Sequence, residues 1–138
     1  MHGVFLDSNI FIYMFDEVDQ RKRHIAEELV NLHLRQATGT ISFQVVQETL
    51  NVVNRDTESE EAVRFLQLFM LPLWKIMPSQ ALYEKGLELQ HRYRYSFYDS
   101  LIITAALEAE CETLYSEDFQ DGQKINGLTI RDPFRVAP

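Results

Sequence analysis

Short apolar runs alternate along the chain with longer segments in which apolar residues recur at intervals of three or four. The short runs are bounded by polar or turn-forming residues, which is the pattern of buried β-strands. They predict strands at 4–6, 40–42, 112–116 and 126–130, and a strand or extended stretch at 73–77. The strand at 126–130 follows a predicted turn at Asp121-Gly122.

The longer segments predict five helices, at about 20–36, 43–55, 58–70, 79–94 and 97–110. Residues at their ends support these bounds. Gly39 follows the first helix, and Ser79 is placed to cap the long fourth helix. Thr57 and Glu60 have the spacing of a capping box for the third helix.

Strands that alternate with helices predict an α/β fold, in which helices cover a parallel sheet. The 138 residues contain no repeat, no low-complexity tract and no flexible linker, so we expect a single domain over 1–138. Ligands of such folds collect at the carboxyl ends of the strands, often near a topological switch point. Functional residues are therefore expected directly after strands or early in the helices that follow.

The net charge of −8 counts against a general nucleic-acid binder, because such proteins usually carry a basic surface. The objection weakens if several carboxylates converge on metal ions, since divalent cations reverse the local field. Cys111 is the single cysteine, so a reducing compartment, the cytoplasm, is expected. We see no signal peptide, and the apolar run Leu101–Leu107 is too short for a membrane span.

Four acidic residues occupy the positions expected of a site. Asp7 directly follows the first predicted strand, and Asp118 follows the strand at 112–116. Glu48 lies in the helix after the second strand, and Asp99 in the first turn of the helix that begins near residue 97. Glu48 and Asp99 adjoin apolar helix faces without a Lys or Arg at helical spacing. Carboxylates in such places are costly unless they are paired, protonated or bound to metal.

Each acid also has an ordinary structural interpretation. Asp7 suits a helix cap, and Asp99 has the spacing to close a capping box. Glu48 suits a helix surface, and Asp118 lies in a loop rich in turn-forming residues. Taken together, these interpretations require four independent coincidences at strand ends, so we favour a shared site.

Carboxylates around Mg²⁺ or Mn²⁺ suit phosphodiester hydrolysis, because the ions orient a water, hold the phosphate and stabilise the leaving oxygen. Such a site needs no His, Ser or Cys nucleophile. The four histidines accordingly show neither metal-ligand spacing nor the context of a catalytic triad.

Four segments of the chain resemble the motifs of PIN domains, in the same order. They are Val4–Asn9, Ser42–Glu48, Ser96–Ala106 and Leu114–Phe119, followed by a similar tail at 122–133. The resemblance covers nearly the whole chain, and the segment 96–106 is the strongest match. It implies a PIN fold, a three-layer α/β/α sandwich with a central, mainly parallel sheet.

The resemblance also implies a ribonuclease that uses Mg²⁺ or Mn²⁺. By motif position, the acids that carry catalysis and bind metal are Asp7, Glu48, Asp99 and Asp118, and the supporting residues are Asn9 and Ser116. Glu117 and Asp121 lie in the same last loop, and whether either shares the role of Asp118 stays open. In its size the chain also resembles VapC-type toxins of toxin–antitoxin pairs. This resemblance implies a homodimer and a cognate antitoxin that enters the acidic cleft.

Two basic segments are candidates for contact with RNA. Arg92-Tyr93-Arg94 lies just before Asp99, where bases and an aromatic ring suit phosphate contact and stacking. The alternative there is side chains that extend into solvent at a helix end. For residues 21–24 we favour a solvated helix start.

Two other functions are compatible with parts of this pattern. A phosphatase with an aspartyl nucleophile needs a second Asp two residues after the first, and that position is Asn9. A non-catalytic PIN-fold RNA-binding or regulatory protein is the remaining alternative, and the presence of all four acids counts against it.

Overall fold

The computed structural model describes residues 3–135, apart from the side chain of Asp56. Its strands are β1 (Val4–Leu6), β2 (Gly39–Ser42), β3 (Trp74–Ile76), β4 (Thr113–Tyr115), β5 (Lys124–Ile125) and β6 (Leu128–Arg131). Its helices are α1 (Ser8–Tyr13), α2 (Gln20–Gln36), α3 (Phe43–Asp56), α4 (Ser59–Phe65), α5 (Gln80–Tyr93) and α6 (Phe97–Glu108), with a π-helical segment, η1 (Leu66–Met70), directly after α4.

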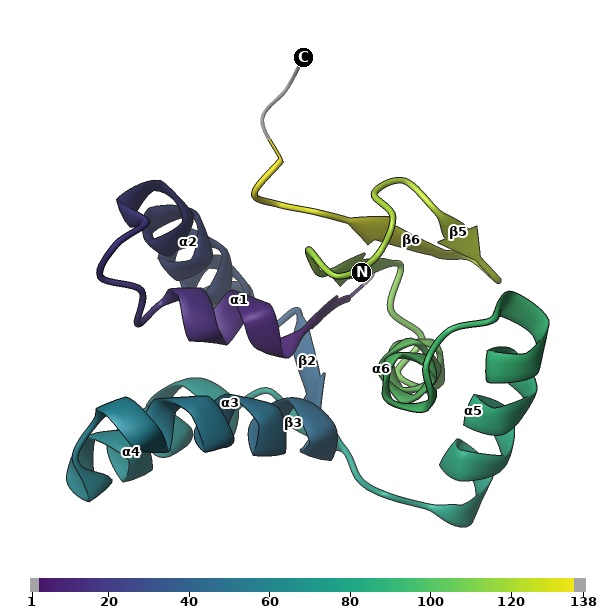
Figure 1. The fold of residues 1–138 in the computed structure, drawn as a ribbon, viewed down its shortest axis with the longest axis horizontal. Coiled ribbons are helices and arrows are strands. Elements are labelled where there is room, and N and C mark those ends of the chain that lie inside the picture. The colour runs from purple at the N-terminus through teal and green to yellow at the C-terminus, as the bar shows by residue number, and fades with distance from the viewer. Residues whose placement is uncertain (1–2, 136–138) are drawn as a thin grey trace.

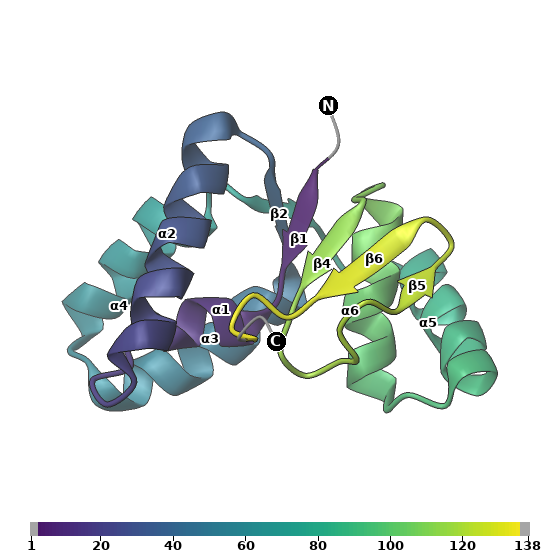
Figure 2. The ribbon, with the colours of Figure 1, turned by 90° about the horizontal axis from the view of Figure 1, so that it is seen from above.

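The six strands form one sheet in the order β3-β2-β1-β4-β6-β5, and every neighbouring pair is parallel except β5 with β6. Helices α1 to α4 lie to one side of β1 and β2, and α5 and α6 lie to the other (Figures 1 and 2). The predicted three-layer α/β sandwich with a mainly parallel sheet is confirmed. Because both faces of the sheet are covered, Phe5, Ile41 and Leu114 have no exposed surface.

The strand order creates a switch point beside β1. The chain leaves β1 toward β2 and β3 on one side, whereas β4 lies on the other side of β1. Leu6 and Tyr115 are partners in the parallel register, so the residues after them, Asp7 and Ser116, begin the two loops that leave this point. The fold thus brings together residues that are more than 100 positions apart.

Most predicted elements are confirmed, and α2 ends before Gly39 as predicted, although another residue caps it. Ala37, at φ 54°, caps α2, and Gly39 instead begins β2, where an added Cβ would lie 3.0 Å from Leu73 Cδ2. Thr57 forms no capping box, because its hydroxyl donates to the carbonyl of Val53 (2.9 Å) at the end of α3. The following helix has no side-chain cap and continues from residue 66 as η1.

The predicted strand at 126–130 corresponds to β6, which begins two residues later, and the short strand β5 before it was not predicted. Asn126 and Gly127, at φ 47° and 88°, form the turn between β5 and β6. Asn-Gly is a strong sequence indicator of such a turn, so the hairpin was open to prediction.

Two further expectations concern the core and the membrane. Cys111 is buried among core residues, and burial raises its thiol pKa to about 11, as suits a packing residue. Of the helices within residues 3–135, none is both long and apolar enough to cross a membrane.

Candidate functional site

Asp7 sits at the carboxyl end of β1 and caps α1. Its Oδ1 accepts from the backbone N–H of Ser8 (2.7 Å), and its Oδ2 accepts from the hydroxyl of Ser116 (2.7 Å). The side chain is buried, with 3% of the residue exposed. The cap interpretation of Asp7 is therefore right, but it accounts for only one of the two carboxylate oxygens.

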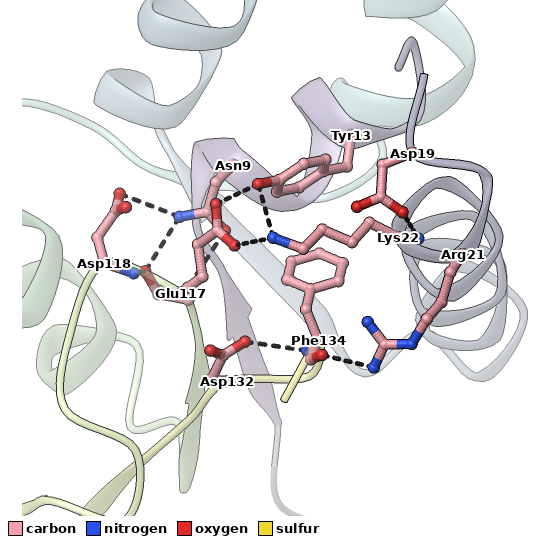
Figure 3. Close-up of polar contacts among 10 residues, drawn as sticks. Asn9, Tyr13, Asp19, Arg21, Lys22, Glu117, Asp118, Asp132 and Phe134 are labelled. Carbon is pink, nitrogen blue, oxygen red and sulfur yellow. Dashed lines mark hydrogen bonds and ion pairs between the residues drawn. The ribbon is translucent and has the colours of Figure 1, made fainter. Parts of the chain in front are cut away.

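The Ser116 hydroxyl connects three of the predicted residues. Besides donating to Asp7, it accepts from Asn9 Nδ2 and from the backbone N–H of Asp118, each at 3.1 Å. Asn9 Nδ2 also donates to Asp118 Oδ2 (3.1 Å; Figure 3). Asn9 and Ser116, the residues predicted to support the site, thus both contact its acids: Asn9 binds Asp118, and Ser116 binds Asp7.

Glu48 reaches the same edge of the sheet from the second turn of α3. Its Oε1 accepts from the hydroxyl of Ser8 (3.1 Å), and its Oε2 lies 3.5 Å from Gln44 Nε2. The same Gln44 nitrogen donates to the carbonyl of Tyr98 (3.0 Å), which ties α3 to the start of α6. Ser8 therefore bridges Asp7, through its N–H, and Glu48, through its hydroxyl.

Asp99 lies in the first turn of α6. Ser96 caps the helix by accepting from the backbone N–H of Asp99 (3.1 Å). The Ser96 hydroxyl also stabilises the half-buried Asp99 carboxylate and lowers its pKa, but burial has the larger effect and raises that pKa.

The four acids share one electrostatic environment. Burial is the largest effect on three of them: it raises the pKa of Asp7 to about 7 and raises the pKa values of Glu48 and Asp99. The charge of Asp118 raises all three pKa values further.

The protein supplies no cation to these acids within its described residues. The ion pairs there join Lys22 to Glu117, Arg23 to Glu27, His24 to Glu28 and Arg135 to Asp121. An uncompensated set of carboxylate oxygens fits a hard divalent cation. Within residues 3–135, however, no three acidic side chains lie close enough together to form a metal site as they stand. Instead, Ser8 and Gln44 donate to the Glu48 carboxylate, and Asn9 donates to the Asp118 carboxylate.

A model of the PIN domain matches residues 4–121. The chain belongs to the PIN domain family. No curated protein gives a significant match. Among solved structures, a chain of a toxin–antitoxin complex from Klebsiella pneumoniae is 20% identical, with a TM-score of 0.72 and coverage of 97% of this chain and 100% of that one.

Two further structures resemble this PIN domain. VapC20 of Mycobacterium tuberculosis, a toxin described as cleaving the sarcin–ricin loop, is 19% identical at a TM-score of 0.62, over 84% of this chain and 90% of that one. A chain of VapBC2 from Rickettsia felis, bound to a DNA fragment from its promoter, is 21% identical. Its TM-score is 0.65, and the match covers 93% of this chain and 96% of that one. At these identities the likeness establishes the fold.

The last loop of the PIN domain separates its three acids. Glu117 binds Tyr13 and Lys22, and Asp121 accepts from the backbone N–H of Asp132 (2.9 Å) and pairs with Arg135. Only Asp118 of the three contacts Asn9 through its carboxylate.

The residues predicted to contact RNA lie at the end of α5. Arg92 and Tyr93 line a pocket of about 450 Å³ between α5 and α6, and none of the four acids lines it. Arg94 ends α5 at φ 60° and is exposed. Contact of these residues with RNA stays a prediction.

The basic segment 21–24 and the histidines have structural contacts. Besides the ion pairs of Lys22 and Arg23, Arg21 Nη2 donates to the carbonyl of Phe134 (2.6 Å). His33 is buried against Thr38, whereas His24 and His91 are exposed; His2 lies outside the described residues.

Sequence reasoning missed two residues of the site. Gln44 lies four positions before Glu48, a spacing that puts both side chains on one helix face, so it could have been found. Ser8 adjoins Asp7, but its contact with Glu48 spans 40 positions and depends on how α1 packs on α3.

Proposed function

We propose that this PIN domain is a metal-dependent ribonuclease and the toxin of a type II toxin–antitoxin pair. The observation that supports the proposal is that Ser8, Asn9 and Ser116 connect Asp7, Glu48 and Asp118 at the switch point, with Asp99 in the first turn of α6. Within residues 3–135, no Lys or Arg forms an ion pair with any of these four acids. Membership of the PIN family supports the same reaction class. The alternative is a non-catalytic PIN-fold protein that binds RNA or regulates expression.

Asp7, Glu48, Asp99 and Asp118 are the residues that would hold Mg²⁺ or Mn²⁺. Divalent ions bound by carboxylates supply an activated water and stabilise the leaving oxygen of a phosphodiester. In the chain itself, Ser116 fixes the Asp7 carboxylate, and Asn9 orients Asp118. These contacts set the direction of the acids before any substrate arrives.

The partners proposed are an RNA substrate, a cognate antitoxin and a second copy of the chain, in the cytoplasm. Support comes from the similar solved structures, which include a toxin described as cleaving the sarcin–ricin loop and chains from toxin–antitoxin complexes. The antitoxin would be expected to cover the acidic edge, where a basic side chain finds unpaired carboxylates.

The test is cleavage of total cellular RNA by the purified chain with Mg²⁺, with Mn²⁺, and with excess EDTA. We expect discrete cleavage with either ion and none with EDTA, because the carboxylates repel one another and the substrate phosphate without a cation. A folded chain that cuts no RNA with either ion would favour the binding-protein alternative. Turnover of a chromogenic phosphomonoester would instead revive the phosphatase.

Ser116→Ala is expected to lower RNA cleavage by about 10-fold to 100-fold, the usual cost of losing a residue that orients metal-binding carboxylates. The substitution removes the donor to Asp7 and the acceptor for Asn9 and Asp118 in a fully buried place. Thr104→Val is the matched control, because it removes a buried hydroxyl of α6 that binds only the carbonyl of Ser100. Equal cleavage by both variants would contradict the role of Ser116.

A further inference from the structure

Beside the acidic edge, three residues from separate elements form a polar cluster: Tyr13 of α1, Lys22 of α2 and Glu117 of the loop after β4. Lys22 Nζ donates to the Tyr13 hydroxyl and to Glu117 Oε2, each at 3.1 Å. The Tyr13 hydroxyl donates to Glu117 Oε1. The cluster therefore engages both oxygens of the Glu117 carboxylate (Figure 3).

Phe134 packs against the cluster and shields it partly from solvent. The ring centroids of Tyr13 and Phe134 are 4.7 Å apart, and Lys22 Nζ lies 5.6 Å from the Phe134 ring. Arg21 holds this end of the chain through the Phe134 carbonyl. The side chains of Lys22 and Glu117 are 27% and 24% exposed. A pair shielded to this degree is better fixed in geometry than the usual surface ion pair.

The same loop is held from its other side by Asn9. The backbone N–H of Glu117 donates to Asn9 Oδ1 (3.4 Å), and Asn9 Nδ2 donates to Asp118 Oδ2 (3.1 Å). Figure 3 shows Glu117 directed toward Tyr13 and Lys22, with Asp118 on the opposite side of Asn9. Two adjacent carboxylates on one loop thus point in different directions, and each has its own donors.

We propose that Lys22 and Tyr13 are positioning residues that bind Glu117 and thereby fix the loop so that Asp118, not Glu117, faces the acidic edge. Lys22 also neutralises the charge of Glu117, which would otherwise add to the repulsion on Asp118. The inference rests on the proposed function, because it assigns these residues to the ordering of a metal-binding acid.

A rival role for Lys22 is direct contact with a phosphate of the RNA. The two roles predict different effects of Lys22→Met and Glu117→Ala on the KM for RNA. If Lys22 positions the loop, Lys22→Met and Glu117→Ala both weaken Mn²⁺ binding and lower kcat, and KM for RNA stays unchanged. If Lys22 binds RNA, Lys22→Met raises KM, whereas Glu117→Ala frees the ammonium group and lowers KM.

The experiment compares Lys22→Met, Lys22→Arg, Glu117→Ala and Tyr13→Phe with the parent chain. Mn²⁺ affinity is measured by calorimetry, and kcat and KM with an RNA oligonucleotide that the parent cuts. We expect about 10-fold weaker Mn²⁺ binding for Lys22→Met and Glu117→Ala, and partial retention for Lys22→Arg. Arg23→Met is the control, because Arg23 is on the same helix and pairs with Glu27 away from the loop.

Amide hydrogen exchange of Glu117 and Asp118 provides a readout that needs neither metal nor RNA. We expect faster exchange of both amides in Lys22→Met, Glu117→Ala and Tyr13→Phe, and parent rates in Arg23→Met. Unchanged exchange and Mn²⁺ affinity in the first three variants would overturn the inference while leaving the nuclease intact. A parent chain that binds no Mn²⁺ and cuts no RNA would refute the proposed function, and exchange would still decide whether the cluster fixes the loop.

Discussion

Asp99→Asn is expected to reduce RNA cleavage by this PIN domain by more than about 100-fold and to leave its fold intact. The carboxylate is half-buried, and burial and the charge of Asp118 raise its pKa, so we expect a bound cation to stabilise its ionised form. Asparagine keeps the shape and the backbone N–H that Ser96 caps, so stability should change by less than about 1 kcal/mol. Cleavage is measured at saturating Mn²⁺, and folding is followed by circular dichroism.

The control for this prediction is Glu108→Gln, which neutralises an exposed acid at the far end of the same helix. It should cut RNA at the parent rate. If Asp99→Asn retained parent activity while binding Mn²⁺ normally, the assignment of Asp99 to the site would be wrong.

The second large effect is on stability. Without divalent ions, we expect the parent chain to lose stability between about pH 4 and pH 7 and Asp7→Asn to lose much less. Burial raises the pKa of Asp7 from 3.8 to about 7, so ionisation is harder in the folded chain than in the unfolded one. The stability that the protonated Asp7 side chain contributes is therefore fully present below about pH 4, and it is lost as the pH rises through about 7.

The size of this effect follows from the two pKa values. A rise from 3.8 to about 7 corresponds to about 4 kcal/mol, so Asp7→Asn should be more stable than the parent by up to that amount at pH 8. Asparagine still accepts from the N–H of Ser8 and preserves the cap of α1, but its amide nitrogen cannot accept from the Ser116 hydroxyl as Asp7 Oδ2 does, which offsets part of the gain. Urea unfolding in EDTA at several pH values measures the difference.

Two comparisons make this stability test decisive. Glu112→Gln removes an exposed acid before β4 and should follow the parent profile. Mn²⁺ at pH 8 should stabilise the parent more than Asp7→Asn, because a ligand stabilises the state that binds it. Identical pH profiles for the parent and Asp7→Asn would show that burial does not raise the pKa of Asp7 in the folded chain.

The strands and helices were predictable where one local cause dominates. The apolar run 4–6 and the periodicity at 20–36 and 43–55 reflect burial on both faces of a sheet and on one face of a helix. Prediction failed where two local causes compete. The Thr57 hydroxyl has equal access to the helix before it and the helix after it, and packing selects the carbonyl of Val53.

The residues of the candidate site were predictable to a similar degree. Asp7 and Asp118 follow strands in sequence, so the parallel-sheet rule alone puts them at one edge. The roles of their neighbours were not accessible in this way. Glu117 and Asp118 are adjacent acids of similar chemistry, and only the contacts of Lys22 and Asn9 give their side chains different directions.

The sequence by itself determined the α/β class, the positions of most elements and the acids that lie after strands or early in helices, because these depend on local pattern and on general rules of sheet topology. The tertiary structure decided which oxygen binds which donor: Ser8 to Glu48, Ser116 to Asp7, and Lys22 with Tyr13 to Glu117. These contacts join residues 40 to 109 positions apart along the chain. Their physical cause is the packing of α1, α2 and α3 around the switch point, which no local pattern encodes.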